Sequence, residues 1–364
     1  MSFLKGMIIM SYYINPNVEN LDRIFDQNLR SGYLRLDLNE NPGGLPEAFI
    51  QKTLSKITPE TIAKYPETLP FTETLAKFLH CSIENICLVN GSSEGIRQVI
   101  EAFSRPGGRI VGADPSYAMF SVYSKMYGRT FVPVPYEKDL SFDSAKLIDA
   151  ITPDTDLVIL LNPNNPMGNV YTRDEVDAVL KKAALCETTV LIDEAYIYFY
   201  PNELLSCAFE RDNVFVTRTF SKLFSLGGLR LGYVCGRPEG IRLVQKLSTP
   251  HNVNAIGLLF AEEIIKTPGM IDGLIEKQRE GKKWLVSELK KNGYSINAGE
   301  GNFIFIKPKT DAAAVMNRMK AEKQILIKTY PSVGELGTCL RVTTGERQYM
   351  ERFLEALYLL DREG

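Results

Sequence analysis

The sequence predicts an α/β protein with a mostly parallel central sheet and a second, smaller α/β domain. Between about residues 85 and 235, short apolar runs alternate with segments that have helical spacing, as in a parallel sheet connected by helices. Each apolar run ends in polar residues, which is typical where ligands bind at the carboxyl ends of parallel strands. After about residue 245 the pattern changes to long amphipathic helices and two further strands.

The strands follow from these apolar runs in chain order. The main sheet is predicted from ICLVN (86–90), RIVGAD (109–114), DLVILLN (156–162), TTVLID (188–193) and NVFVT (213–217). A helix after the first run carries apolar residues at helical spacing from Ile96 to Phe103, and another begins with the capping pattern Thr172-x-x-Glu175. Later strands are predicted at NFIFI (302–306) and CLRVTT (339–344), before a terminal helix over about 346–361.

These patterns divide the chain into three parts. We expect residues 1–45 to form an N-terminal arm and part of the small domain, because the first convincing core strand begins only near residue 86. The large domain, which contains the apolar strands with polar ends, is predicted over 46–245. The small C-terminal domain is predicted over 246–364.

Composition excludes several classes of function. The chain has 42 basic and 44 acidic residues and a formal net charge of −2, so we expect no nucleic acid and no membrane as partner. No apolar run approaches a membrane span, and Lys5 and Gly6 interrupt the opening MSFLKGMIIM, which argues against a secretory signal. The six cysteines show no metal-binding spacing, which favours reduced thiols in the cytoplasm. With two histidines, a multi-histidine zinc site and Ser-His-Asp hydrolysis are poorly supported, and we expect no metal.

The loop NGSSEG (90–95) leaves a predicted strand and enters a predicted helix. Backbone N–H groups at such a helix start can bind an anion, with Ser92 and Ser93 as further donors. The alternative is that one of these serines only caps the helix.

A second stretch, TFSKLFSLGGLR (219–230), can add Thr219, Ser221 and Arg230 to the same anion site. Lys222 is followed by apolar residues, which would desolvate its amine and lower its pKa. An amine of this kind beside a phosphate site suggests a Schiff base with pyridoxal phosphate. The pyridine nitrogen then needs an acid, and Asp193 ends an apolar strand. The alternatives are that Lys222 and Arg230 are solvated surface charges and that Asp193 is a helix cap.

An ordered set of motifs resembles the fold-type I aminotransferases over nearly the whole chain after about residue 35, and within them the histidinol-phosphate aminotransferase branch. The motifs are LDLNENP (36–42), YPE (65–67), NGSSEG, DPSYAMF (114–120), NPNNPMG (162–168), IDEAY (192–196), TFSKLFSLGGLRLGY (219–233) and CLRVTTG (339–345). As a set in this order they are specific, although no single motif is.

The resemblance implies a pyridoxal-phosphate-dependent aminotransferase and gives roles to its residues. Lys222 would hold the cofactor and carry a proton as base and then acid, Asp193 would pair with the ring nitrogen, and Tyr117 would stack on the ring. Asn165 and Tyr196 would bond the phenolic oxygen. Ser92, Ser93, Thr219, Ser221 and Arg230 match the phosphate site, and Tyr65 matches a tyrosine supplied by the neighbouring subunit of a homodimer with shared active sites.

At the substrate end, the resemblance assigns Arg341 to the substrate carboxylate, with Lys328 and Asn39 as further substrate-binding residues. Lys328 stands where the branch often has an arginine, so it offers a point charge without a planar fork. Met167 replaces a threonine of the branch, and the segment before LDLNENP shows no match to the family's substrate-closing arm.

These features favour an aminotransferase that uses glutamate as donor and a small keto or amine compound, with or without a phosphate, as second substrate. One alternative is a decarboxylase of a phosphorylated amino acid, like the threonine-phosphate decarboxylases. The other is a non-catalytic binding module that retains the fold.

Overall fold

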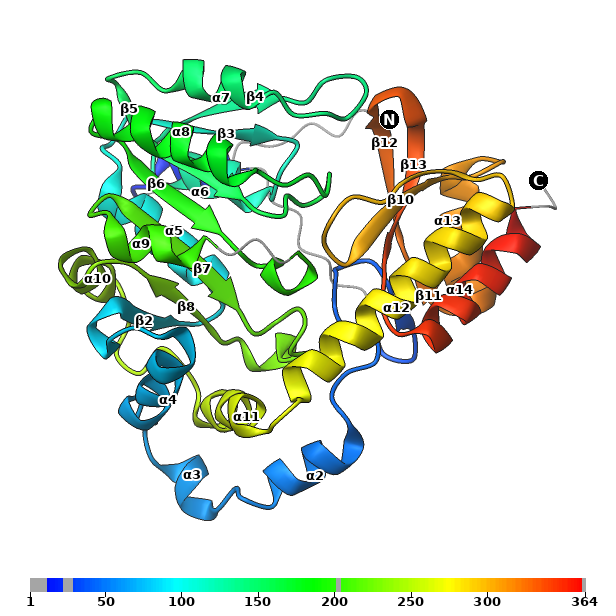
Figure 1. Ribbon diagram of the computed structural model, residues 1–364, viewed down its shortest axis with the longest axis horizontal. Helices are drawn as coiled ribbons and strands as arrows, with labels where there is room; N and C mark the ends of the chain where they lie inside the picture. The colour runs from blue at the N-terminus through cyan, green and yellow to red at the C-terminus, as the bar shows by residue number, and fades with distance from the viewer. Residues whose placement is uncertain (1–11, 22–28, 201–203, 362–364) are drawn as a thin grey trace.

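The computed structural model describes residues 12–21, 29–200 and 204–361. The opening run MSFLKGMIIM and part of the predicted N-terminal arm lie outside these ranges. Figure 1 shows two lobes of unequal size, with the long helix α12 (Met270–Lys291) running from one to the other.

The larger lobe is built on a seven-stranded sheet in the order β2-β8-β7-β6-β5-β3-β4. All of its strands except β8 run in one direction, and β8 is antiparallel to β2 and β7. The predicted mostly parallel sheet is therefore confirmed. The strands are β2 (Ile86–Val89), β3 (Arg109–Asp114), β4 (Thr130–Pro135), β5 (Thr155–Leu161), β6 (Thr189–Asp193), β7 (Val214–Thr219) and β8 (Gly232–Cys235). The sequence had not predicted β4 and β8.

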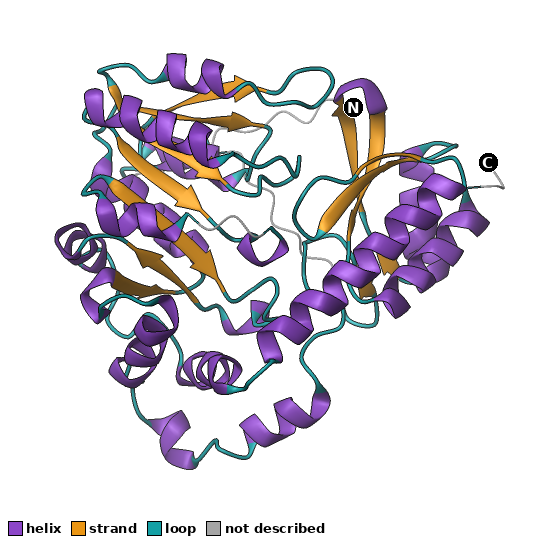
Figure 2. Cartoon of the chain, viewed as in Figure 1, coloured by secondary structure: helices purple, strands orange, loops and turns teal. Residues whose placement is uncertain are grey.

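Helices cover both faces of this sheet because its inner strands are apolar on both sides (Figure 2). Along β5, for example, Val158 and Leu160 belong to one core, while Leu157, Ile159 and Leu161 belong to another on the opposite face. The first face is covered by α4 (Leu69–Leu79), α7 (Ser144–Ala150), α8 (Arg173–Leu185), α9 (Leu205–Glu210) and α11 (Ala255–Lys266). The second is covered by α5 (Ser92–Phe103), α6 (Met119–Met126) and α10 (Pro238–Gln245).

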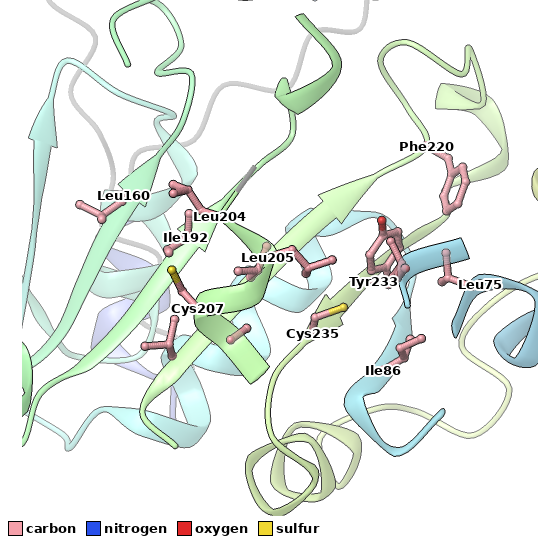
Figure 3. Packing of buried hydrophobic residues seen from close by; sticks show 14 of the residues in the cluster. Leu75, Ile86, Leu160, Ile192, Leu204, Leu205, Cys207, Phe220, Tyr233 and Cys235 are labelled. Atoms are coloured by element: carbon pink, nitrogen blue, oxygen red, sulfur yellow. The ribbon is translucent and has the colours of Figure 1, made fainter. Parts of the chain in front are cut away.

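Buried contacts at the first face fix the sheet beneath the site. Figure 3 shows Leu160 and Ile192, from β5 and β6, beside Leu204 and Cys207. All four side chains are fully buried. Burial of an aliphatic side chain of this size contributes about 1.5–3 kcal/mol to the free energy of unfolding. The ends of β5 and β6 are therefore firmly packed.

The helix starts match the sequence patterns. The predicted capping box of α8 is present, because Glu175 N–H donates to Thr172 Oγ1 at 3.3 Å and Thr172 N–H donates to Glu175 Oε2 at 2.8 Å. The shorter helices are α1 (Pro16–Glu19), α2 (Glu47–Leu54) and α3 (Pro59–Ala63), with 3-10 turns η1 (Ile83–Asn85), η2 (Ile197–Phe199), η3 (Gly227–Leu229) and η4 (Gly334–Leu336).

The smaller lobe contains an antiparallel sheet in the order β12-β13-β10-β9. Its strands are β9 (Ser295–Asn297), β10 (Phe303–Lys307), β12 (Lys328–Val333) and β13 (Gly337–Thr343), packed with α12, α13 (Ala312–Lys323) and α14 (Arg347–Leu360). A short strand near the chain start, β1 (Leu34–Arg35), pairs in parallel with β11 (Ile325–Leu326). The segment that leads into LDLNENP is therefore part of this lobe.

The packing favours a boundary between the two lobes that lies after residue 245. Leu258 and Ala261 of α11 lie in the core of the larger lobe. Helix α12 contributes Leu274 to that core and Leu285 and Leu289 to the core of the smaller lobe. We therefore propose a domain boundary within α12 instead of at 245–246.

Candidate active site

The polar residues that follow the parallel strands meet at one cavity of about 350 Å³. The loops after β2, β3, β5, β6 and β7 all contribute to its wall, because the carboxyl ends of parallel strands lie at the same edge of a sheet. The smaller lobe closes the cavity with residues of β12, β13 and the segment after β1. The lining includes Asn39, Ser92, Ser93, Tyr117, Asn165, Asp193, Tyr196, Thr219, Ser221, Lys222, Arg230, Lys328 and Arg341.

One end of the cavity is rich in donors. Arg230 has left-handed backbone geometry, with φ of 50°, and donates to Ser221 Oγ at 3.3 Å. Thr219 Oγ1 lies 3.0 Å from the same Ser221 oxygen. A Cβ on Gly91 would lie 2.5 Å from Arg230 Nη2, so only glycine lets this guanidinium reach the start of α5. The hydroxyls, the helix start and the guanidinium together suit a phosphate.

Asp193 lies at the end of β6 and is 2% exposed. Burial raises the pKa of its carboxyl to about 7, and this outweighs a hydrogen bond from Ala195 N–H at 3.1 Å. A buried carboxylate with so little compensation would be stabilised by a cation, such as a protonated ring nitrogen.

Lys222 lies in the wall of the same cavity, where it is partly exposed to the cavity itself. Desolvation, together with the positive charge of Arg341, lowers the pKa of its amine to about 8. Its Nζ donates to Leu38 O at 3.1 Å and lies 5.7 Å from the centre of the Tyr196 ring. The lowered pKa makes Lys222 a better nucleophile and proton carrier than an exposed lysine.

The smaller lobe contributes two cations to the wall of the cavity. Lys328 and Arg341 are directly opposite each other on β12 and β13. Arg341 Nη1 donates to Asn165 Oδ1 at 3.0 Å, and its guanidinium lies 5.7 Å from the centre of the Tyr330 ring. The sequence interpretation missed Tyr330, although its place two residues after Lys328 in a strand puts it on the same face.

Aromatic and amide groups line the middle of the cavity. Tyr117 OH lies 3.0 Å from Ser93 Oγ, and burial raises the pKa of the Tyr117 phenol. Burial also raises the pKa of Tyr196 to about 12, so this phenol keeps its proton at neutral pH. Asn39 Nδ2 donates to Tyr196 Oη at 2.9 Å. The prediction that Asn39 binds substrate stays a prediction, and its amide already contacts protein groups.

Tyr65 is not brought to this cavity. Its side chain is 77% exposed and stacks on His251, with ring centres 4.2 Å apart. This position leaves the ring available to another surface. Met167, the other departure noted in the sequence, is buried against Phe305 in a separate small core and does not line the cavity.

A buried ion pair lies next to Asp193, at the end of β6. The sequence interpretation gave this pair no role. Arg218 Nη2 lies 2.8 Å from Glu194 Oε2, and Glu194 Oε1 accepts a hydrogen bond from Leu204 N–H at 2.7 Å. Glu194 follows Asp193 directly, so this pair fixes the end of β6. The available signal was an arginine inside the apolar run VFVTRT.

Replacing Arg218 with alanine is expected to lower the free energy of unfolding by about 3–5 kcal/mol, because Glu194 would be left buried without its cation. The urea denaturation midpoint measures this change. The control is Arg173→Ala, which breaks an exposed pair with Asp177 on α8 and should cost about 0.5 kcal/mol or less. Equal losses in the two variants would contradict the support role.

The residues of the cavity fit pyridoxal phosphate in its functional groups. The donors around Arg230 could hold the phosphate, Asp193 could pair with the ring nitrogen, Tyr196 and Asn165 could bond the phenolic oxygen, and Lys222 could take the aldehyde. Among the described residues, no helix is long and apolar enough to cross a membrane, and no three acidic, histidine or cysteine side chains gather as metal ligands.

Comparisons with known proteins agree with this chemistry. The model of the aminotransferase class I and II family matches residues 31–357. A histidinol-phosphate aminotransferase of Moorella thermoacetica is 33% identical over 331 residues, which cover 89% of this chain and 84% of that protein. One from Thermoanaerobacter sp. is 32% identical, with 89% of this chain and 92% of that protein covered.

Solved structures share the fold. The histidinol-phosphate aminotransferase of Sinorhizobium meliloti, in complex with pyridoxal-5′-phosphate, has a TM-score of 0.87 at 23% identity, covering 98% of this chain and 100% of that chain. The L-threonine-O-3-phosphate decarboxylase of Porphyromonas gingivalis has a TM-score of 0.76 at 24% identity, covering 90% and 98%.

Proposed function

Because the chain belongs to the class I and II aminotransferase family, we propose that its cavity exchanges an amino group between glutamate and a small anionic keto or amine compound. The protein is a pyridoxal-phosphate-dependent aminotransferase similar to the histidinol-phosphate aminotransferases. The proposal concerns the roles of its residues, the choice of substrate and the assembly in which it works.

One observation carries the proposal: a single cavity combines the donors around Arg230 with two further cations from the smaller lobe. Its described lining contains four cationic side chains and one acid, Asp193. Arg230 and Lys222 serve the cofactor, which leaves Arg341 and Lys328 for a second ligand. A substrate with two anionic groups, such as a carboxylate and a phosphate at different stages of the reaction, matches this charge.

The cofactor-binding roles are divided among the walls of the cavity. When bound, pyridoxal phosphate supplies an aldehyde that takes up amino groups and a ring that withdraws electrons from the substrate's α-carbon. Asp193 would keep the ring nitrogen protonated, and Tyr117 would cover the face of the ring. The residues that would hold the phosphate are Ser92, Ser93, Thr219, Ser221 and Arg230.

Lys222 performs the proton transfer. Its amine would hold the cofactor through the aldehyde and, once freed, would remove the proton from the substrate's α-carbon. The amine has a pKa of about 8, so it can accept and release this proton near neutral pH. Because the amino group leaves the donor before the second substrate enters, ping-pong kinetics are expected.

We infer a homodimer with shared active sites in the cytoplasm. Tyr65 is exposed and remote from its own cavity, which supports a role at the phosphate of the partner subunit. Since the site of one subunit would then lack a donor without the other, dimer formation and cofactor affinity should be linked.

Lys328→Ala is expected to raise the KM for a phosphorylated substrate about tenfold more than the KM for its unphosphorylated analogue, because one charge-assisted contact is lost. Lys328→Arg should restore the wild-type KM for the phosphorylated substrate. The comparator is Arg341→Ala, which should raise the KM for glutamate by about 10- to 100-fold, as expected for a carboxylate anchor. Equal changes for both substrates in Lys328→Ala would exclude a phosphate role for this lysine.

The function itself is tested with the purified holoenzyme and a panel of phosphorylated and unphosphorylated amines. We expect glutamate alone to convert the cofactor to its aminated form and to yield 2-oxoglutarate, and a phosphorylated compound to be the best second substrate. Release of carbon dioxide without a keto product would show that the enzyme is a decarboxylase and not an aminotransferase. If the purified protein takes up no pyridoxal phosphate, the result would favour the alternative of a non-catalytic binding module.

A further inference from the structure

Four side chains from distant parts of the chain form one line of hydrogen bonds across the cavity. Arg341 Nη1 donates to Asn165 Oδ1 at 3.0 Å. Asn39 Nδ2 lies 3.4 Å from the same Asn165 oxygen and 2.9 Å from Tyr196 Oη. The line therefore joins β13, the loop after β5, the segment after β1 and the loop after β6.

The direction of every bond in this line follows from its first member. A guanidinium can only donate, so the Asn165 atom that faces Arg341 is the carbonyl oxygen. The Asn39 atom that faces this oxygen must in turn be the amide nitrogen, which makes Tyr196 Oη an acceptor toward Asn39. The single proton of the Tyr196 hydroxyl is then free to point elsewhere.

Asn39 is held firmly in this position. It is 1% exposed, and its backbone has φ of 57°, a conformation that asparagine tolerates better than most residues. Its N–H donates to Thr343 Oγ1 at 3.0 Å, and its carbonyl accepts from Asn302 Nδ2 at 3.1 Å. Thr343 Oγ1 also lies 3.4 Å from Asn39 Oδ1, which fixes the oxygen side of the amide.

This arrangement leaves two donors in the cavity wall. Within the part of the chain that the structure describes, Tyr196 Oη has a hydrogen bond to Asn39 alone, and Asn165 Nδ2 has none. Both residues line the cavity beside Lys222. One acceptor oxygen of a bound ligand can satisfy both donors.

We propose that Asn39 is a positioning residue, whose amide holds Tyr196 and Asn165 as hydrogen-bond donors toward the phenolic oxygen of the cofactor. This inference rests on the proposed function. Donors to that oxygen stabilise its negative charge and so weaken its attraction for the proton on the neighbouring Lys222 nitrogen. Asn39 would thereby lower the pH at which the holoenzyme loses this proton, without touching the cofactor.

The test is a pH titration of the visible absorption of the holoenzyme in two variants. Asn39→Gly removes the amide and keeps the left-handed backbone without strain. Asn39→Asp keeps the shape but replaces the donor with an acceptor, so Tyr196 would turn its proton toward residue 39. Both variants are expected to raise the titration midpoint by about one pH unit, a tenfold gain in proton affinity, as expected for one hydrogen bond.

Two controls separate this role from a structural one. Asn302→Ala loosens the same backbone segment but leaves the Asn39 amide in place, so its midpoint should stay at the wild-type value. Asn39→Gly should shift the midpoint in a Tyr196→Phe background by no more than half of its shift in the wild type, because one of the two positioned donors is already missing. A full shift in that background, or an equal shift in Asn302→Ala, would overturn the proposal.

The same spectra distinguish the inference from its premise. A wild-type protein with no visible band that depends on Lys222 would contradict the proposed function. A normal band with wild-type midpoints in Asn39→Gly and Asn39→Asp would contradict the role of Asn39 alone and leave the function intact.

Discussion

Lys222→Ala is expected to lower the rate of transamination by at least about 10⁴-fold, because both the attachment of the cofactor and the proton transfer depend on this amine. The variant should also lose the visible absorption of the holoenzyme. Steady-state kinetics with glutamate measure the first effect, and an absorption spectrum at fixed pH measures the second.

Lys282 provides a matched control for Lys222. It is also largely buried, and desolvation lowers its pKa to about 8 as well, but it lies in another cavity and donates to Gly301 O at 2.8 Å. Lys282→Met should keep the visible band even if it lowers stability. Borohydride reduction of the wild-type holoenzyme, followed by peptide mass analysis, should find the cofactor on Lys222. Label on Lys282 instead would refute the assignment.

Asp193→Asn is expected to lower kcat on the order of 10³-fold and to weaken cofactor binding, because an amide cannot keep the ring nitrogen protonated. Asp114→Asn is the control, since Asp114 is also a carboxylate at the end of a parallel strand but is exposed. Comparable losses in the two variants would show that Asp193 has no special part in the reaction.

The pH dependence of the stability of the cofactor-free protein should reflect the raised pKa of Asp193. Its pKa is about 7 in the folded chain and near 4 when unfolded, so the folded state binds more protons between these values. The contribution of Asp193 to stability is therefore full below about pH 4 and is lost as the pH rises through 7. Thermal melts of the cofactor-free protein should show this decline, and Asp193→Asn should reduce it.

Most of the residues proposed to bind the cofactor line one cavity, as the sequence led us to expect, because they lie in loops that follow apolar strands. Parallel strands bring their carboxyl ends together, so Asp193, Lys222 and the loop at Ser92 had to lie near one another once the sheet was inferred. The strand β8 was not predicted because its four residues, GYVC, are too few to show a strand pattern of their own. Its first residue must be glycine, since a Cβ on Gly232 would lie 2.7 Å from Ser92 N.

The contacts that orient the catalytic groups could not be predicted in the same way. Asn39 and Tyr196 are 157 positions apart, and Lys222 and Leu38 are 184 apart. Contacts of this kind arise only when the two lobes meet, and no local pattern of spacing indicates them. Arg218 and Glu194 were visible as charges at strand ends, but their pairing depends on the neighbouring positions of β6 and β7.

The pairing of β1 with β11 also makes the pocket depend on residues that are synthesised after the larger sheet. Leu36 N–H donates to Leu326 O, and Thr343 N–H donates to Leu36 O, each at 2.8 Å. The residues that immediately follow Leu36 supply the carbonyl that holds Lys222 and the amide that holds Tyr196. A chain synthesised only to the end of β8 therefore cannot complete the pocket, because the segment that follows β1 is held in place by residues 326 and 343.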